Sequence, residues 1–295
     1  MIKNVLIYSQ VISEMQVSYL DILLEKLELE GFNIFIYDKF HKYILDITGN
    51  DLKYPLIYDK DSLKKENIDL LISIGGDGTI LNSAVLINDT EIPIVGINLG
   101  RLGFLAIVEK NKIGEYVSKI KRGDYSIQKR SMLKLNSKPM IFKDENIALN
   151  DFTVHKSSSP AVIVVHTFLN EKFLTSYWVD GLIISTPTGS TGYSLSCGGP
   201  IVFPGSGTFI ITPVAPHNLT MRPIIVPDNS KIRLEIESRS ESVLCSLDSR
   251  YETISPDHEL TIQKNDYDIN LLVFSGLDFS DNINYKLNWG ADKRN

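Results

Sequence analysis

The sequence has few cysteines, no long apolar run and no excess of positive charge, and each of these absences excludes a class of protein. Its two cysteines, Cys197 and Cys245, lie far apart and form no Cys-x-x-Cys pair, which argues against a disulfide framework or a zinc site. No apolar run approaches the roughly 18 residues that a membrane span needs. The formal net charge of −6 argues against nucleic-acid binding, because phosphate backbones need clustered Lys and Arg. We therefore expect a cytoplasmic protein with reduced thiols that binds neither nucleic acid nor membrane.

Two familiar nucleotide-binding motifs are also missing. The chain contains no Gly-Lys dipeptide, so it has no Walker A loop. No Gly-x-Gly-x-x-Gly follows an early strand, which excludes the Rossmann dinucleotide fingerprint. The histidines show no metal-ligand spacing. A nucleotide bound by this chain must therefore be held in another way.

The pattern of predicted elements divides the chain of 295 residues, which exceeds the usual size of one domain. Residues 1–125 alternate short apolar runs with segments of helical periodicity, which predicts an α/β domain with a mostly parallel sheet. Residues 126–275 contain short runs separated by Gly, Pro, Asn and Ser, which predicts an all-β domain resembling a sandwich. Residues 276–295 include an amphipathic segment, 282–289, and we expect them to return to the first domain.

One glycine-rich segment carries the clearest chemical signal. The apolar run from Leu70 to Ile74 leads into Gly75-Gly76-Asp77-Gly78-Thr79, after which a helix is predicted. In open α/β sheets, ligands bind at the carboxyl ends of the strands, where this turn falls. Glycines let backbone N–H groups approach a phosphate, and the start of a helix favours an anion. The segment therefore predicts a phosphate-binding turn.

Asp77 needs its own explanation, because a carboxylate within this turn repels phosphate. It fits if Asp77 accepts a proton from an attacking hydroxyl or holds magnesium. The alternative is a tight strand-to-helix turn in which Asp77 only caps the helix. The spacing alone leaves these alternatives open.

Several segments resemble a known family. Gly75-Gly76-Asp77-Gly78-Thr79 is similar to the signature shared by NAD kinases, diacylglycerol and sphingosine kinases and, more distantly, 6-phosphofructokinases, and alone it does not choose among them. The further segments that resemble NAD kinases are 98–105, 150–151, 180–196, 212–217 and 246–249. Because they occur in order with plausible spacing over about residues 1–290, the chain is identified as a member of the NAD kinase family.

The resemblance implies an activity and a set of site residues. ATP would donate its γ-phosphate to the 2′-hydroxyl of the adenosine ribose of NAD, with Mg²⁺ or another divalent cation, and Asp77 would be the general base. The residues implied to bind substrate or cofactor are Gly76, Gly78, Thr79, Phe104, Asn150, Asp151, Asp180, Thr188, Thr191, Gly192, Tyr193, Ser196 and Asp248. Asp180 would serve a neighbouring subunit, which implies a homodimer or homotetramer.

Two positions depart from the pattern of the family. Asp151 stands where many relatives have Glu, so its shorter side chain would contact the ribose either directly or through water. Gly192 replaces an alanine that is common in relatives. A lipid kinase that shares the turn is one alternative function, but segment 180–196 gives it no support. The other is an NAD(P)-binding sensor without activity, against which the presence of Asp77 argues.

Overall fold

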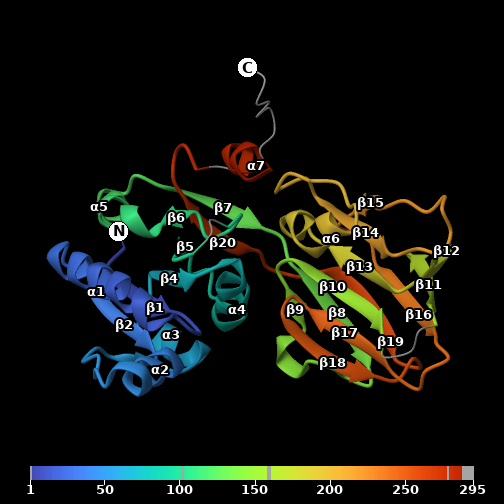
Figure 1. Cartoon of the computed structure of the whole chain (residues 1–295), viewed down its shortest axis with the longest axis horizontal. Helices are drawn as coiled ribbons and strands as arrows, with labels where there is room; N and C mark the ends of the chain where they lie inside the picture. The colour runs from blue at the N-terminus through green and yellow to red at the C-terminus, as the bar shows by residue number, and fades with distance from the viewer. Residues whose placement is uncertain (1, 101–102, 158–160, 278, 288–295) are drawn as a thin grey trace. The chain divides into compact units, whose positions relative to one another are not determined.

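The computed structural model describes residues 2–100, 103–157, 161–277 and 279–287 (Figure 1). The chain divides into two compact units. The first comprises residues 1–128 and 269–295, and the second comprises residues 129–268. Each unit is built around its own hydrophobic core.

The first unit contains an eight-stranded sheet with the order β3-β2-β1-β4-β5-β20-β7, in which β6 also pairs with β5. Its strands are β1 Asn4–Tyr8, β2 Asn33–Tyr37, β3 Leu56–Ile57, β4 Leu70–Gly75, β5 Ile94–Asn98, β6 Val108–Glu109, β7 Ser126–Arg130 and β20 Ile269–Val273. The pairs β1–β2, β1–β4, β2–β3, β4–β5, β5–β6 and β5–β20 are all parallel. The predicted α/β fold with a mostly parallel sheet is therefore confirmed.

Helices join the strands of the first unit, and several of them share the hydrophobic core of the sheet. They are α1 Glu14–Leu29, α2 Asp38–Thr48, α3 Lys60–Lys65, α4 Asp77–Ile87, the 3₁₀ turn η1 Lys110–Lys112, α5 Ile113–Arg122 and α7 Phe279–Leu287. In α1, Leu20, Leu23 and Leu27 are fully buried at helical spacing. Gly31 follows with φ +71°, the left-handed conformation expected after a helix end.

The second unit contains two six-stranded sheets, ordered β15-β14-β13-β10-β17-β18 and β12-β11-β16-β19-β8-β9. Its strands are β8 Leu133–Lys138, β9 Ile147–Ala148, β10 Asp151–Lys156, β11 Ile163–Leu169, β12 Lys172–Val179, β13 Gly181–Ser185, β14 Thr208–Val214, β15 Ile224–Pro227, β16 Ile232–Glu237, β17 Val243–Leu247, β18 Arg250–Ile254 and β19 Glu259–Lys264. Three short helical turns accompany them, η2 Lys143–Glu145, η3 Thr188–Thr191 and α6 Tyr193–Ser196. Inward-facing residues of both sheets form one core, which confirms the all-β, sandwich-like prediction.

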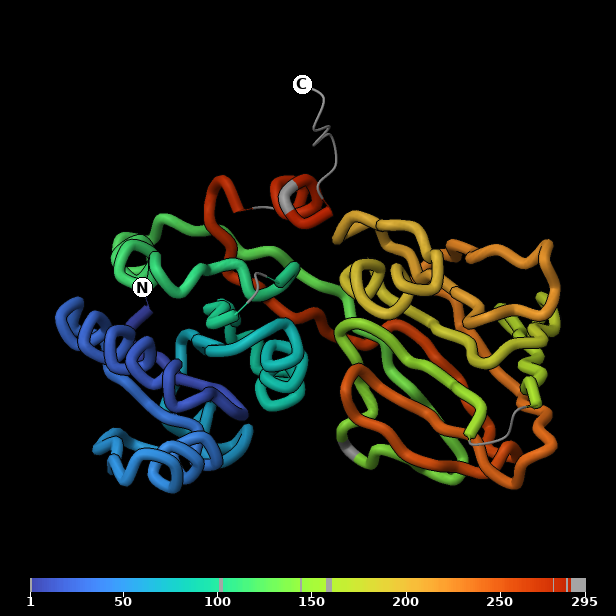
Figure 2. The backbone as a smooth tube through the Cα atoms, viewed as in Figure 1, coloured from blue at the N-terminus to red at the C-terminus, as the bar shows by residue number. Residues whose placement is uncertain are grey.

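The observed units differ from the expected boundaries in two respects, the first of which is that β7, Ser126–Arg130, belongs to the sheet of the first unit. The sequence places residues 126–275 in the all-β domain, but β20 joins the parallel sheet of the first unit beside β5. The red trace of residues 269–273 runs back into that sheet in Figure 2. The strand is apolar on both faces, with Ile269, Leu271 and Leu272 buried, as suits a parallel sheet covered on both sides. The amphipathic segment forms α7, and Trp289 lies outside the described residues.

Candidate active site

The glycine-rich turn joins β4 to α4 at the carboxyl end of a parallel strand. Gly75 has a φ of +149°, and a Cβ there would fall 2.2 Å from Thr79 Oγ1, so a side chain is excluded. A Cβ on Gly76 or Gly78 would meet nothing within 4 Å, so both glycines face open space. The helix starts at Asp77 with N–H groups that lack partners within the helix. The turn therefore offers an open surface, rich in N–H groups, that a phosphate can approach.

The Asp77 carboxylate accepts three backbone hydrogen bonds from the loop that follows β5. Oδ2 accepts the N–H of Phe104 at 2.7 Å. Oδ1 accepts the N–H groups of Leu105 and Ala106 at 3.0 and 2.9 Å. The N-cap of α4 is Gly76, and Asp77 is the first residue of the helix. The Asp77 carboxylate accepts hydrogen bonds from a distant loop and does not cap its own helix. The capping alternative is therefore wrong.

Phe104 extends from this loop with its side chain half-buried. Its ring centroid lies 6.2 Å from that of Phe279, and the Lys286 ammonium lies 4.6 Å from the ring centroid. Both partners belong to α7, which sequence reasoning did not connect with the site. Within the family-like segment 98–105, Arg101 and Leu102 lie outside the described residues.

In the second unit, Asp248 binds the backbone immediately before β10. Its Oδ2 accepts the Leu149 N–H at 2.9 Å, and its Oδ1 accepts those of Asn150 and Asp151 at 2.8 and 3.1 Å. The Asp248 N–H donates in return to the Asp151 carbonyl at 3.0 Å. Burial raises the pKa of Asp248, while the three backbone N–H bonds lower it. The resemblance implies that Asp248 lies near the nucleotide, but each of these carboxylate contacts is made to the backbone of its neighbours.

Asn150 and Asp151 present their side chains beside this anchored backbone. Asn150 Oδ1 is buried and has no hydrogen-bond partner within the described part of the chain. Asp151 is 7% exposed, and its pKa is raised to about 7, first by burial and then by the charge of Asp248. The Thr153 hydroxyl, which donates to Asp151 Oδ1 at 3.3 Å, opposes this shift. The pair combines an unsatisfied acceptor with a carboxyl group that titrates near neutrality.

The Ser/Thr/Gly-rich segment after β13 packs directly against Asn150. Thr186 donates its N–H to the Asn150 carbonyl at 2.9 Å, and a Cβ on Gly189 would fall 2.2 Å from that oxygen. A Cβ on Gly192 would lie 3.4 Å from Asn150 Nδ2 and 3.9 Å from Asp151 Oδ2. The fold therefore brings together two segments that the sequence predicts separately.

The remaining expected residues of this segment differ in exposure. Thr188 is buried, and Thr191 donates its hydroxyl to the Thr188 carbonyl at 3.2 Å. Tyr193 is 41% exposed, and Ser196 is exposed. Tyr193 and Ser196 thus present polar groups to solvent at the two ends of α6.

Arg130 is a residue near this segment that sequence reasoning missed. It is 4% exposed, and its guanidinium donates to Thr188 Oγ1 at 3.5 Å. Burial lowers the pKa of Arg130 to about 10. A lone arginine at the end of β7 gave no signal in the sequence, because only the fold places it beside the loop.

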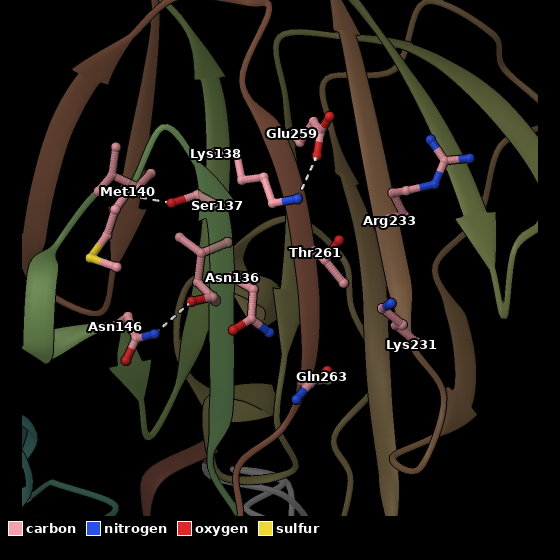
Figure 3. Close-up of a pocket in the computed structure, with 12 residues that line it drawn as sticks. Asn136, Ser137, Lys138, Met140, Asn146, Lys231, Arg233, Glu259, Thr261 and Gln263 are labelled. Atoms are coloured by element: carbon pink, nitrogen blue, oxygen red, sulfur yellow. Dashed lines mark hydrogen bonds and ion pairs between the residues drawn. The ribbon is translucent and has the colours of Figure 1, made fainter.

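A separate hollow of about 500 Å³ lies over β8, β16 and β19 of the second unit (Figure 3). None of the residues expected from the sequence is among those that line it. Lys138 and Glu259 point toward one another at its edge, 3.9 Å apart. Arg233 is paired with Glu171 at 3.2 Å. Because its cations have acidic partners, this hollow is not the candidate active site.

Comparison with known proteins gives the family. A model of the ATP-NAD kinase N-terminal domain matches residues 39–125, and a model of the ATP-NAD kinase C-terminal domain matches residues 149–273. The chain belongs to the ATP-NAD kinase family. It is therefore a kinase, a phosphotransferase of the NAD kinase type, and the lipid-kinase alternative loses its support.

Curated NAD kinases are similar to between about three quarters and nearly all of the chain. The NAD kinase of Cytophaga hutchinsonii is 50% identical over 227 residues, which is 77% of this chain and 78% of that protein. The NAD kinase of Christiangramia forsetii is 41% identical over 291 residues, which is 98% of this chain and 99% of that protein.

Solved structures of NAD and NADH kinases share the fold. The crystal structure of yeast NADH kinase complexed with NADH has a TM-score of 0.84 and 26% identity, and the match covers 99% of this chain and 89% of that one. An NAD kinase from Archaeoglobus fulgidus in complex with ATP has a TM-score of 0.68 and covers 92% and 94% of the two chains. At 23% identity, this second likeness bears on the fold alone.

Asp180, which the NAD kinase resemblance assigns to a neighbouring subunit, lies apart from Asp151 in its own chain. β13 runs from Gly181, next to Asp180, to Ser185, which is paired with Asp151. This stretch of strand is roughly 13 Å long at about 3.3 Å per residue. Asp180 instead forms an ion pair with Lys156 Nζ at 2.7 Å. Within one chain, Asp151 and Asp180, which are both expected to bind the dinucleotide, therefore lie at opposite ends of β13.

The described residues contain neither a cluster of metal ligands nor a membrane-spanning helix. Within residues 2–100, 103–157, 161–277 and 279–287, no group of three or more His, Cys, Asp or Glu side chains is arranged to hold a metal ion. None of the described helices has the length and apolar character that crossing a membrane requires.

Proposed function

We propose that this member of the ATP-NAD kinase family transfers the γ-phosphate of ATP to the 2′-hydroxyl of the adenosine ribose of NAD, with Asp77 as general base. The ribose oxygen forms a bond to the γ-phosphorus, the bond from that phosphorus to the bridging oxygen of ADP breaks, and Asp77 takes the hydroxyl proton. The products are NADP and ADP. The observation that carries the proposal is a carboxylate at the start of α4, between two glycines that face open space.

The hydrogen bonds of Asp77 leave room for this role. An ionised carboxylate offers about four lone-pair sites, and the loop N–H groups occupy three of them. Oδ2 accepts one N–H and retains a site for the ribose hydroxyl. Phosphoryl transfer has a loose transition state that needs little activation of the nucleophile. Most of the rate enhancement should therefore come from holding the hydroxyl in line with the phosphorus.

We assign the phosphates to the turn in the first unit. Gly76 and Gly78 leave room for a phosphate and offer it their backbone N–H groups. Thr79 provides a hydroxyl, and Phe104 lies beside the nucleotide. ATP enters as its complex with Mg²⁺ or another divalent cation, which is bound through the phosphates.

We assign the ribose hydroxyls to the start of β10. Asn150 Oδ1 lacks a partner, so it can accept a ribose hydroxyl. Asp151 can donate when protonated and accept when ionised, directly or through one water. Asp248 acts on the ligand through the backbone of these two residues, because its carboxylate accepts their N–H groups.

The segment after β13 is proposed to bind the rest of the dinucleotide. Thr188, Thr191, Gly192, Tyr193 and Ser196 provide hydroxyls, a close backbone approach and a ring for stacking. Asp180, which lies away from Asp151 within the chain, is proposed to recognise the nucleotide of a neighbouring subunit. The functional form is then a homodimer or homotetramer, placed in the cytoplasm, with NAD and ATP as its small-molecule partners.

The first experiment is to incubate the purified protein with ATP, Mg²⁺ and NAD and to detect NADP with an NADP-specific dehydrogenase. Asp77→Asn should lower kcat by roughly 10²–10⁴, because an amide cannot take the hydroxyl proton. Dinucleotide affinity should change much less, because the Asn oxygen can still accept the N–H groups of Leu105 and Ala106, and only the bond to Phe104 is lost. The matched control is Asp61→Asn, which removes an acid from the first turn of α3. The control should keep the wild-type kcat.

Other outcomes would point elsewhere. NAD binding without NADP formation would favour the sensor alternative, and lipid substrates would then be tested. Near-normal kcat in Asp77→Asn would remove this carboxylate from the chemistry while leaving the kinase activity in place.

A further inference from the structure

Phe104 is held from two sides within the first unit. On the backbone side, its N–H and those of the next two residues donate to Asp77. On the side-chain side, its ring contacts Phe279 and the ammonium group of Lys286, both on α7. Leu105 and Ala106 are buried, whereas Phe104 is half-exposed. The C-terminal helix therefore contacts the exposed member of a loop that the candidate catalytic carboxylate anchors.

We propose that α7 is a positioning element of the active site, in which Phe279 and Lys286 fix the ring of Phe104 in the orientation that binds the nucleotide. This inference rests on the function proposed above. α7 lies beyond residue 273, outside both ranges that the family models match. Neither residue is proposed to touch substrate, since both act through Phe104.

The hydrogen bonds of Asp77 leave the orientation of the Phe104 ring undetermined. Its three hydrogen bonds fix the backbone of residues 104–106 but not the χ angles of a half-exposed ring. An aromatic partner at 6.2 Å and a cation at 4.6 Å each favour one ring orientation. A ring already in its bound orientation does not have to be ordered when the nucleotide binds, which strengthens binding.

Among the described residues of this unit, three other lysines lie over aromatic rings, so the contact alone does not distinguish Lys286. They are Lys110 over Tyr19, Lys119 over Tyr116 and Lys121 over Phe32. Only Lys286, of these four, lies over a ring on the loop that donates to Asp77. Lys121, whose ammonium lies 4.8 Å from the ring centroid of Phe32, is therefore a matched control for the same kind of contact.

The test compares Lys286→Met, Lys286→Arg and Lys121→Met in the full chain, each with Phe104 and with Phe104→Leu. We expect Lys286→Met to raise the KM for NAD about two- to fivefold, the size of one exposed cation–π contact, with kcat within about twofold. Lys286→Arg should restore the KM, because a guanidinium also binds a ring face. Lys121→Met should leave the KM unchanged.

The Phe104→Leu background decides whether Lys286 acts through the ring. If it does, Lys286→Met should add nothing to Phe104→Leu. An equal effect in both backgrounds, or an equal rise in KM from Lys121→Met, would overturn the proposal. If the wild-type protein makes no NADP, the proposed function fails, and the mobility of the Phe104 ring, measured by side-chain NMR relaxation, then decides the inference alone. The ring should be more mobile in Lys286→Met than in Lys121→Met, and equal ring mobility would overturn the inference.

Discussion

The Asp77 carboxylate occupies the space that a side chain on residue 103 would need. A Cβ on Gly103 would fall 1.7 Å from Asp77 Oδ1 and 2.7 Å from Oδ2. Gly103 is buried and directly precedes the three residues whose N–H groups the carboxylate accepts. The glycine and the aspartate therefore form one structural feature, although they are 26 positions apart in the sequence.

Gly103→Ala should displace Asp77 and break its bonds to the loop. The carboxylate cannot stay in place, because the new Cβ would fall 1.7 Å from Oδ1. Its displacement is costly, because hydrogen bonds to a charged group are worth roughly 1.5–3 kcal/mol each. We expect kcat/KM for NAD to fall at least about 100-fold, measured by NADP formation. Gly114→Ala within α5 is the control, because its Cβ meets only the end of Lys26 at 4.0 Å. Normal activity in Gly103→Ala would contradict the observed geometry.

Asp248→Asn should weaken both folding and dinucleotide binding. Its amide NH₂ would face backbone N–H donors, so at least one bond to residues 149–151 is lost. We expect the free energy of unfolding to fall by about 1.5–3 kcal/mol and the KM for NAD to rise. Denaturant unfolding and steady-state kinetics measure the two effects. Asp228→Asn, which breaks a 2.7 Å ion pair with Lys264 elsewhere in the second unit, should lower stability only.

The same pair of measurements separates two roles for Asp248. A higher KM with unchanged stability would mean that Asp248 touches the ligand directly. A higher KM that accompanies lower stability means that it acts through the backbone of Asn150 and Asp151.

Asp151 should make stability depend on pH. Its pKa is raised from 3.8 to about 7, chiefly by burial, so the folded protein holds a proton that the unfolded chain has released. The favourable contribution of this group to the unfolding free energy is therefore complete below about pH 4 and is lost as the pH rises through about 7. Asp151→Asn cannot ionise, so it should be more stable than the wild type by up to about 4 kcal/mol at pH 8. The difference should shrink toward pH 4 in denaturant unfolding, and a difference independent of pH would argue against the shift.

Two glycines of the Ser/Thr/Gly-rich segment after β13 should respond differently to alanine. At Gly192, where φ is −96°, the new Cβ meets the Gly189 carbonyl at 3.2 Å and Asn150 Nδ2 at 3.4 Å. This contact is much milder than the one at Gly189, so Gly192→Ala should change the KM for NAD less than about threefold. At Gly189 the Cβ would fall 2.2 Å from the Asn150 carbonyl oxygen, so Gly189→Ala should raise the KM at least tenfold. Equal effects of the two substitutions would show that this segment does not pack as described.

Mixing subunits tests whether Asp180 serves a neighbouring chain. Asp180→Ala and Asp77→Asn should each be nearly inactive alone. If Asp180 acts across an interface, random mixed dimers contain one complete site, and the mixture should regain about a quarter of the wild-type activity. If Asp180 acts within its own chain, every site carries one defect, and mixing should restore nothing. Activity measured after refolding the two variants together decides between these outcomes.

Much of the fold was predictable because its signals are local. The buried leucines of α1, Gly31 after it and the apolar run of β4 follow from short-range periodicity and backbone preference. The glycine-rich turn could also be placed at a strand end, since its glycines are consecutive with the strand. The resemblance to NAD kinases then indicated the candidate site residues, because the motifs of that family occur in order along the chain.

The sequence by itself determined the two fold classes and the glycine-rich turn at the end of β4, and its resemblance to NAD kinases named Asp77 as the candidate base. Only the tertiary structure decided which atoms those residues contact. In the folded chain, Asp77 accepts hydrogen bonds from residues 104–106, and Asp248 accepts them from residues 149–151. Arg130 lies beside Thr188, and β20 and α7 belong to the first unit. Each of these is a contact between segments far apart in sequence, where no periodicity or spacing operates. Such contacts form only when burial of the apolar cores fixes the segments side by side, so that a carboxylate meets the N–H groups of a distant loop.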